Sequence, residues 1–308
     1  MYRYILKRVF MSILTLFVLA TITFFMMKAI PGNPFARDNK RSISPQIMAA
    51  INKQYGFDKP ILEQYIMYLG NAVRGNFGVS FKRIGVTTTQ VISRAAPTTA
   101  RLGMVAFVIS LALGILFGVV SALTKKKWIN NIITVFATLG VSVPGFLLAL
   151  LMMIIFGVRL KILPIVGLKT GLHYIMPAMA LSFYPISMIT RLTRSSLRDV
   201  MNKDYITLAR SKGTSEVAVI IKHGLKNALL PVITYCGPMF AYLLTGSFVI
   251  ETLFSVPGIG AEFISSVINR DYTVIMGLTL FLGVIILFMN LVSDLVAAIV
   301  DPRIRFEK

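Results

Sequence analysis

The sequence is short of charge, and of negative charge above all. Only 14% of its residues are Asp, Glu, Lys or Arg, against about 25% in ordinary globular chains, while 56% are hydrophobic. A soluble domain of this composition could not cover its apolar side chains with polar ones, and a disordered chain would be poor in apolar residues. The composition therefore predicts an integral membrane protein.

Cysteine and histidine are scarce as well. The single cysteine, Cys236, cannot form a disulfide within the chain. His173 and His223 are far apart and no H-E-x-x-H motif occurs, so a zinc site is disfavoured. The sequence also lacks a G-x-x-x-x-G-K-[ST] phosphate-binding loop. We therefore expect no metal, no ATP and no other cofactor on this chain. Its few, scattered acidic residues argue against a membrane enzyme, and we expect no catalytic residue.

Lysine and arginine, by contrast, are abundant. They number 32 against 12 acidic residues, for a net charge of +20. In a soluble protein this excess would suggest nucleic-acid binding, but here the basic residues stand between long apolar runs. We interpret them as charges that set the orientation in the membrane and face anionic lipid. The lipid bilayer is therefore the expected partner, and nucleic acid is not.

Six apolar runs are long enough for the roughly 20-residue helix that crosses a bilayer. We expect spans over residues 9–30, 99–123, 129–157, 172–192, 228–250 and 273–299, in a single transmembrane domain that covers residues 1–308. The predicted fold class is an all-α polytopic membrane protein with six transmembrane helices. If the N-terminus is cytoplasmic, the cytoplasmic side carries Lys125, Lys126, Lys127 and the basic residues of segment 191–226. Cytoplasmic loops are enriched in Lys and Arg, so both termini are expected in the cytoplasm.

The long external loop, residues 31–98, carries helix signals of its own. Ser44-Pro45 predicts one helix start and Asp58-Lys59-Pro60 predicts another. An amphipathic face then follows at helical spacing, formed by Leu62, Tyr65, Ile66 and Leu69. The sequence therefore predicts a small helical cap on the outer surface.

The internal loop, residues 194–227, predicts two short amphipathic helices separated by a glycine. Asn202 is expected to cap the first helix, and Gly213, with positive φ, to end it. Ser215 and Glu216 are expected to begin the second helix. The predicted apolar faces are Tyr205, Leu208 and Ala209 in the first helix, and Val217, Ile220, Ile221 and Leu225 in the second. Periodicity alone leaves open whether this surface lies on lipid or binds a protein.

Several ordered blocks resemble a known family. The run Asp204-Tyr-Ile-Thr-Leu-Ala-Arg-Ser-Lys-Gly213, followed by His223 and Asn227-Ala-Leu-Leu-Pro231, resembles the cytoplasmic "EAA" loop of bacterial ABC importer permeases. Pro31-Gly32-Asn33-Pro34, Gly75-Asn-Phe-Gly-Val-Ser80 and Glu251-Thr-Leu-Phe-Ser-Val-Pro-Gly-Ile-Gly260 look like blocks of the B-type subunit of oligopeptide and dipeptide permeases, within the peptide and nickel family. Thr207 replaces the glutamate for which the loop is named, so no carboxylate role is assigned there.

The resemblance implies the type I ABC importer permease fold and a subunit that moves peptides, most readily oligopeptides, across the bacterial cytoplasmic membrane. It implies a second, C-type permease, two ABC ATPase subunits that hold ATP and Mg, an extracytoplasmic peptide-binding protein, and a peptide substrate. Nickel, haem or another small chelate is an alternative cargo. A stand-alone secondary transporter is the alternative of a different class, but it would show internal repeats or several intramembrane charges.

The resemblance and the positions of residues along the chain together suggest site residues. The expected coupling loop comprises Asp204, Tyr205, Ala209, Arg210, Lys212, Gly213, Ser215, Glu216 and His223. Structural roles in or near the membrane are expected for Asp294, Pro231 and Asn227, with Asp294 paired to another residue rather than relaying protons. An external gate or a contact with the binding protein is expected at Glu251, Pro257, Gly258, Arg270 and Asp271.

Overall fold

Helices make up most of the described protein. The computed structural model describes residues 2–29, 58–83 and 85–300. Within these ranges the β pairing is confined to an isolated bridge between Val79 and Thr87, so the expected all-α fold is confirmed. The predicted helix start at Ser44-Pro45 and the block Pro31-Gly32-Asn33-Pro34 lie outside the described residues.

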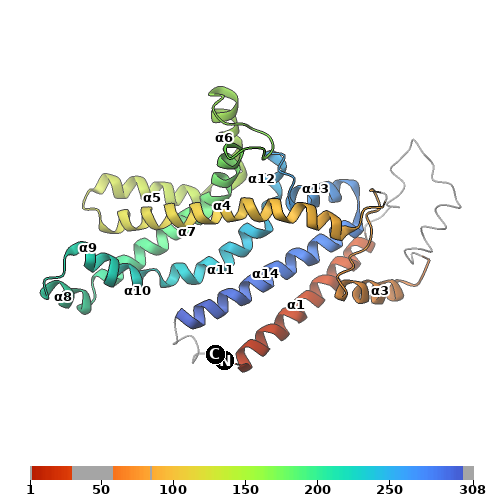
Figure 1. Ribbon diagram of the computed structural model, residues 1–308, viewed down its shortest axis with the longest axis horizontal. Helices are drawn as coiled ribbons and strands as arrows, with labels where there is room; N and C mark the ends of the chain where they lie inside the picture. Colours follow the sequence, from red (N-terminus) through yellow and green to blue (C-terminus); the bar gives the residue numbers. More distant parts are fainter. Residues whose placement is uncertain (1, 30–57, 84, 301–308) are drawn as a thin grey trace. The chain divides into compact units, whose positions relative to one another are not determined.

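The helices follow one another in the order shown in Figure 1. The long ones are α1 (Tyr2–Ala29), α4 (Thr88–Leu123), α5 (Lys127–Ser142), α7 (Leu172–Met201), α11 (Leu230–Thr245) and α14 (Tyr272–Val300). The shorter ones are α3 (Ile61–Val73), α6 (Gly145–Met152), α8 (Asp204–Ser211), α9 (Glu216–Ala218), α10 (Lys226–Ala228), α12 (Phe248–Leu253) and α13 (Ile259–Asn269). Two π-helical segments, η1 (Met153–Arg159) and η2 (Val219–Leu225), continue α6 and α9.

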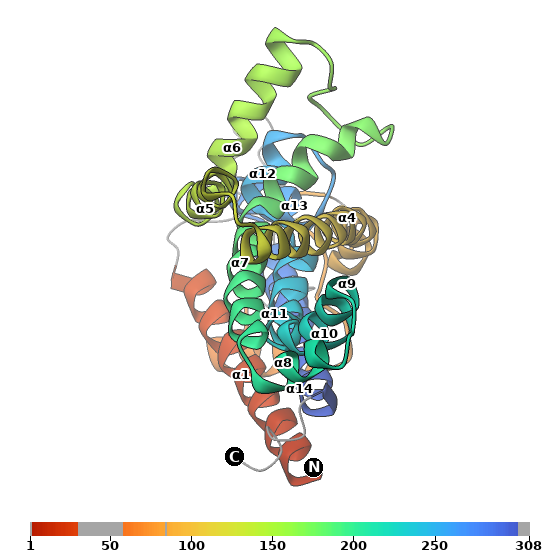
Figure 2. The same ribbon diagram turned by 90° about the vertical axis from the view of Figure 1, so that its left-hand side faces the viewer.

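Five helical stretches of the described chain are long and apolar enough to cross a membrane, and a bent pair makes a sixth if it counts as one span. The pair is α5 with α6–η1, and the helix axis bends by 110° between them (Figure 2). Pro144 explains the break, because proline lacks an N–H and disfavours a helical conformation in the residue before it. Val143 is accordingly extended, with φ −90° and ψ 123°.

Contacts within the chain define two compact units, Met1–Pro97 with Ala261–Ile285, and Thr98–Gly260 with Ile286–Lys308. In the first unit, α3 packs on α1 through aromatic side chains. The Thr21 and Tyr65 hydroxyls share a hydrogen bond of 2.6 Å, and the Phe24 ring lies 5.3 Å from that of Tyr65. The helix expected after Pro60 is therefore present, but Leu62 and Ile66 of its predicted apolar face are 66% and 61% exposed.

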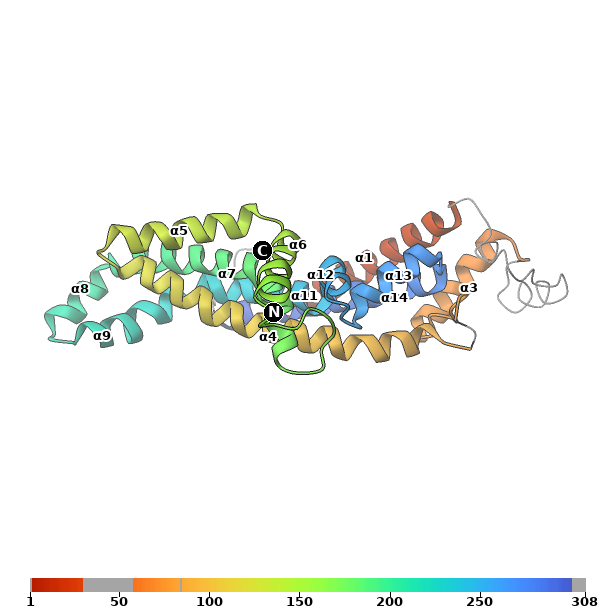
Figure 3. The ribbon, with the colours of Figure 1, turned by 90° about the horizontal axis from the view of Figure 1, so that it is seen from above.

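In the second unit the core lies among α4, α7 and α11, with Leu102, Ile189 and Leu243 almost fully buried. Small residues bring these helices close together. A Cβ on Gly114 would lie 2.6 Å from Ile189 Cβ, and one on Gly118 would lie 2.5 Å from Thr193 Cβ. Glycines four residues apart on an apolar helix allow such close packing in membranes. On the other side of α7, α5 runs beside it (Figure 3).

Candidate functional site

The internal loop folds as a helical hairpin, formed by α8 and by α9 with its continuation through η2 to α10 (residues 204–228). Gly213 has φ of +76°, so the expected left-handed residue at the end of the first helix is confirmed. The second helix begins at Glu216 after Ser215, also as expected. The predicted cap at Asn202 is wrong: α7 extends to Met201, Asn202 ends it, and Lys203 is the N-cap of α8.

The hairpin has a small core of its own. Ile206, Ala209 and Val219 are buried and pack against Val200 and Met201 at the end of α7. This differs from the predicted apolar faces, in which only Ala209 of these three was included. The reason is tertiary: α7 continues to Met201, beyond the predicted span 172–192, and covers one side of α8. Periodicity within the loop does not report this contact.

Four large side chains of the predicted apolar faces point to solvent instead. Tyr205, Leu208, Val217 and Ile221 are 41%, 56%, 67% and 57% exposed. Figure 1 shows α8 and α9 at one end of the second unit, beyond the ends of α5 and α11. We call these four side chains the apolar hairpin surface. Large apolar side chains that stay exposed outside the long helices are typical of an interaction site.

Polar contacts hold the hairpin in shape. The Arg210 guanidinium donates to the Glu216 carboxylate across the turn at Gly213, with a closest distance of 2.7 Å. This hydrogen bond lowers the pKa of Glu216 and raises that of Arg210. Asn227 donates from Nδ2 to the Tyr205 hydroxyl and to the His223 carbonyl, each at 3.2 Å. Asn227 therefore ties α10 to α8.

The remaining loop and span residues lie as follows. Asp204 is exposed in the first turn of α8, and Lys212 is exposed at its C-cap. Pro231 is in the first turn of α11. Asp294 is half-buried on α14.

The expected external residue Glu251 is fully buried in the second unit. Its carboxylate accepts hydrogen bonds from Thr99 Oγ1 at 3.0 Å and from the Gly260 N–H at 2.8 Å. Thr99 Oγ1 in turn accepts from the Ile259 N–H at 2.8 Å. Gly258 is packed against this carboxylate, since a Cβ there would lie 2.3 Å from Glu251 Oε2. The group therefore fastens the turn after α12 to α4.

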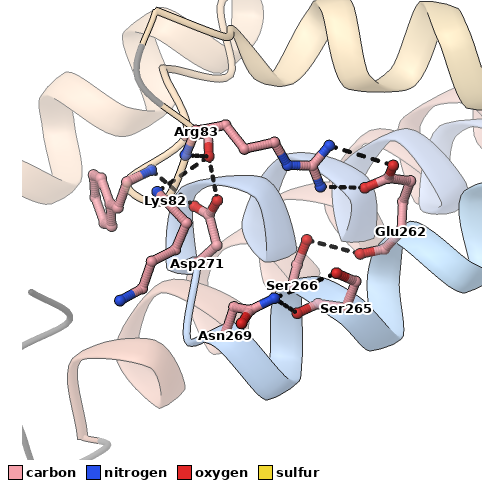
Figure 4. Close-up of polar contacts among 9 residues, drawn as sticks. Lys82, Arg83, Glu262, Ser265, Ser266, Asn269 and Asp271 are labelled. Atoms are coloured by element: carbon pink, nitrogen blue, oxygen red, sulfur yellow. Dashed lines mark hydrogen bonds and ion pairs between the residues drawn. The ribbon is translucent and has the colours of Figure 1, made fainter. Parts of the chain in front are cut away.

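Asp271 is the other carboxylate expected outside, and it is also buried. It accepts hydrogen bonds from the Ser80 hydroxyl and, at 3.1 Å, from the Phe81 N–H in the first unit. Beside it, Arg83 and Glu262 form a bidentate ion pair (Figure 4), which raises the pKa of Arg83.

The buried positions of Glu251 and Asp271 change which of the residues expected outside the membrane can meet another protein. Glu251 and Asp271 are engaged inside the chain, so in this structure their carboxylates present no surface to a binding protein. Pro257 is exposed and Arg270 is half-buried with φ of +56°. In the described ranges no group of three His, Cys, Asp or Glu side chains is placed to hold a metal ion.

Solved structures first show which fold the chain adopts. The inward-facing MetNI methionine ABC transporter matches with a TM-score of 0.55 at 18% identity, over 69% of this chain and 97% of that chain. An amino acid ABC transporter matches with a TM-score of 0.52 at 16% identity, over 70% of this chain and 94% of that chain. The expected permease fold of ABC importers is therefore confirmed.

Sequence comparison then places the chain in a family. The model for the binding-protein-dependent transport system inner membrane component matches residues 114–306, and the model for the N-terminal part of such components matches residues 1–102. The chain belongs to this family of multi-pass membrane transport components.

Relatives align with the chain almost from end to end. The dipeptide transport system permease protein DppB of Lactococcus lactis subsp. cremoris is 42% identical over 99% of this chain and 100% of its own length. DppB of Bacillus subtilis is 40% identical over 100% and 99%. The oligopeptide transport system permease protein OppB of Escherichia coli K12 is 39% identical over 99% and 100%. The resemblance to peptide permeases found in the sequence is confirmed.

Proposed function

We propose that this chain is the permease subunit of an ATP-driven importer that moves peptides across the cytoplasmic membrane. Relatives named as dipeptide and oligopeptide permeases, aligned over nearly the whole chain, support peptide cargo. In this proposal a second, C-type permease completes the path, an extracytoplasmic binding protein delivers the peptide, and two ATPase subunits hold ATP and Mg. Oligopeptides remain the expected cargo, and nickel, haem or another small chelate is the alternative within the family.

The apolar hairpin surface is the observation that carries the coupling step. A helix that places apolar side chains in a groove of a second protein is a common recognition mode. The hairpin has its own buried contacts, Ile206 and Val219 among them, so it can transmit force as a unit rather than spread on lipid. The ATPase pair, closed by ATP, would bind one conformation of the permease pair more tightly than the other. This difference in affinity would shift the permease pair towards that conformation.

A charge placed on this surface tests the coupling. Val217→Glu should leave membrane abundance near that of the parent, because Val217 is 67% exposed. It should also remove ATPase co-purification and peptide uptake together. Val73→Glu is the matched control, since Val73 is 90% exposed on α3, outside the hairpin. Full ATPase co-purification by Val217→Glu would contradict this docking surface.

Reconstitution separates this function from a stand-alone secondary transporter. Liposomes that contain the two permeases, the two ATPases and loaded binding protein should take up peptide only with ATP. The chain has no phosphate-binding loop, so alone it should neither hydrolyse ATP nor transport. Uptake by the isolated chain, driven by an ion gradient, would favour the secondary transporter instead.

The proposed orientation has cytoplasmic N- and C-termini. In a Cys236→Ser background, a cysteine replacing Ile66 should react with an impermeant thiol reagent added outside intact cells. A cysteine replacing Ser215 should react only after the membrane is opened. Both positions are exposed, with Ile66 at 61%, so a failure to react reports the side of the membrane. The opposite labelling pattern would reverse the orientation.

A further inference from the structure

A cavity of about 450 Å³ lies between α5 and α7 and reaches the end of α4, all within the second unit. Its most prominent lining groups are three arginines of α7, Arg191, Arg194 and Arg198. Spacings of three, four and seven residues place side chains on one face of a helix. The facing helix α5 contributes Thr134 and Thr138. We call this space the arginine cavity.

The three arginines have little to neutralise them. Arg194 donates to the Thr134 hydroxyl at 2.8 Å, Arg191 to the Thr138 hydroxyl at 3.3 Å, and Arg198 to the Ser121 carbonyl at 3.3 Å. In the part of the chain that the structure describes, no ion pair joins any of them to a carboxylate. A guanidinium carries five N–H donors, so most of this donor capacity is left for an external acceptor.

Asp199 is the one carboxylate on the cavity wall. It offsets a single positive charge of three, so the lining keeps a net positive charge. Clustered cations at the end of a membrane-spanning helix attract the anionic headgroups of the membrane surface.

A buried hydroxyl on the same wall also lacks a partner. Thr190 is 1% exposed, lines the cavity, and its Oγ1 makes no hydrogen bond within the described structure. The protein encloses this atom, so a ligand in the cavity would meet the arginines and the α5 hydroxyls of Thr134 and Thr138 rather than Thr190 Oγ1.

The position along the helices indicates which ligand reaches the cavity. Residues 172–190 of α7 carry no Asp, Glu, Lys or Arg, and at 1.5 Å per residue they measure about 28 Å. That length matches the hydrocarbon core of a bilayer, about 30 Å. Arg191 therefore stands where the hydrocarbon core ends. Arg198 contacts Ser121 near the end of α4, shortly before Lys125, Lys126 and Lys127, at the depth of lipid headgroups.

We infer that the arginine cavity binds the phosphate of an anionic phospholipid headgroup. Guanidinium groups pair with phosphate through two parallel hydrogen bonds, and basic pockets between membrane helices bind acidic headgroups. The volume exceeds that of a single phosphate ion and accommodates a phosphoglycerol group. The acyl chains would lie over the exposed face of α5, where Ile132, Val135 and Leu139 are 60%, 58% and 49% exposed.

The test measures lipid retained by the full chain. The protein is reconstituted in nanodiscs of phosphatidylcholine and phosphatidylglycerol in equal parts, and the bound lipids are counted by native mass spectrometry. The parent should retain phosphatidylglycerol in excess. Each of Arg191→Gln, Arg194→Gln and Arg198→Gln should lower that excess by about fivefold, the factor expected for one basic residue near an anionic headgroup.

The matched control is the triple variant Lys125→Gln, Lys126→Gln, Lys127→Gln. It is compared with the triple arginine variant, which combines Arg191→Gln, Arg194→Gln and Arg198→Gln. Both triple variants remove the same charge at the same end of the helices, but the lysines are exposed positions outside the cavity. The lysine variant should lose clearly less of the lipid excess than the triple arginine variant, because the lysines do not line the cavity. Equal loss from both triple variants would show a general surface effect and overturn the site.

A further variant guards against misfolding as an explanation. Asp199→Asn should raise phosphatidylglycerol retention, an outcome that a damaged fold does not produce. If Asp199→Asn leaves retention unchanged, the inference is wrong.

Competition distinguishes the source of the anion. Millimolar inorganic phosphate should leave phosphatidylglycerol bound, and so should an acidic dipeptide. Displacement of the lipid by inorganic phosphate would assign the cavity to a free anion. Displacement by the dipeptide would assign it to cargo. Either result would overturn the lipid assignment.

Discussion

Arg210 and Glu216 are joined by two hydrogen bonds, 3.1 Å from Nε and 2.7 Å from Nη2, across the turn at Gly213. The pair connects the end of α8 to the first turn of α9. Both groups are exposed, and exposed ion pairs add little stability. Its expected importance lies in fixing the angle between the two helices that carry the apolar hairpin surface.

Reversal of this pair tests that role. Glu216→Lys should reduce transport and ATPase co-purification, because it places two cations side by side and a cation at a helix N-terminus. Arg210→Glu should also reduce both, and the double variant should restore most of the loss by re-forming the pair. Lys222→Ala, at an exposed position of η2, is expected to have a milder effect. A double variant no better than Glu216→Lys alone would contradict the geometric role.

The same pair should titrate in a predictable direction. Arg210 lowers the pKa of Glu216 from its ordinary value of 4.5 by hydrogen bonding to the carboxylate. A carboxylate whose pKa is lowered on folding contributes above its unfolded pKa, and the contribution disappears as pH falls through the folded value. The contact should therefore persist at neutral pH and break only below pH 4.5. Carboxyl ¹³C NMR of Glu216 should show a higher midpoint in Arg210→Gln than in the parent.

Gly213 provides a second test of the hairpin. Its φ is +76° and no other atom lies within 4 Å of where a Cβ would stand, so a side chain there meets backbone strain but no clash. Gly213→Val should cost about 1–2 kcal/mol locally, lower transport strongly, and leave expression and insertion near normal. Gly213→Asn should be tolerated better, because Asn adopts the left-handed conformation more readily. Equal transport by parent and Gly213→Val would refute the turn's role.

Part of this arrangement could be predicted from the sequence because it is local. Gly213, Ser215 and the helix after Pro60 follow from capping and turn chemistry within a few residues. The buried side of the hairpin could not be predicted, because it depends on how far α7 extends. The partner of Glu251 could not be predicted either, because Thr99 is 152 residues away in sequence. The G-x-x-x-G spacing of Gly114 and Gly118, which our sequence analysis did not use, could also have predicted the contact of α4 with α7.

The buried contact of Glu251 predicts a large effect from a small change. Thr99→Val keeps the shape of the side chain but removes a hydroxyl that both donates to Glu251 and accepts from the Ile259 N–H. Leaving these buried groups unpaired should cost about 1–3 kcal/mol. Thermal unfolding in detergent should show Thr99→Val melting below the parent and Thr99→Ser close to it. Indistinguishable melting of all three would contradict the proposed fastening of this turn.

Helix spacing gives the last prediction. Gly140 of α5 faces α7 so closely that a Cβ would lie 1.8 Å from Ser187 Oγ and 3.0 Å from the Phe183 carbonyl oxygen. Gly140→Ala should therefore force the helices apart and cost about 1–3 kcal/mol, as overpacked cores do.

Adding Ser187→Gly to Gly140→Ala should recover much of the lost stability, because it removes Ser187 Oγ, the atom nearest to the new Cβ. Recovery should be incomplete, because the Phe183 carbonyl oxygen stays in place. Gly70→Ala is the matched control: Gly70 lies within α3 and has no atom within 4 Å of a Cβ. There the replacement should stabilise the protein slightly, by about 0.5–1 kcal/mol, because alanine favours a helix over glycine. The test compares the thermal unfolding midpoints of the parent, Gly140→Ala, the double variant and Gly70→Ala. If Gly140→Ala melts no lower than Gly70→Ala, α5 and α7 are not packed as closely as described.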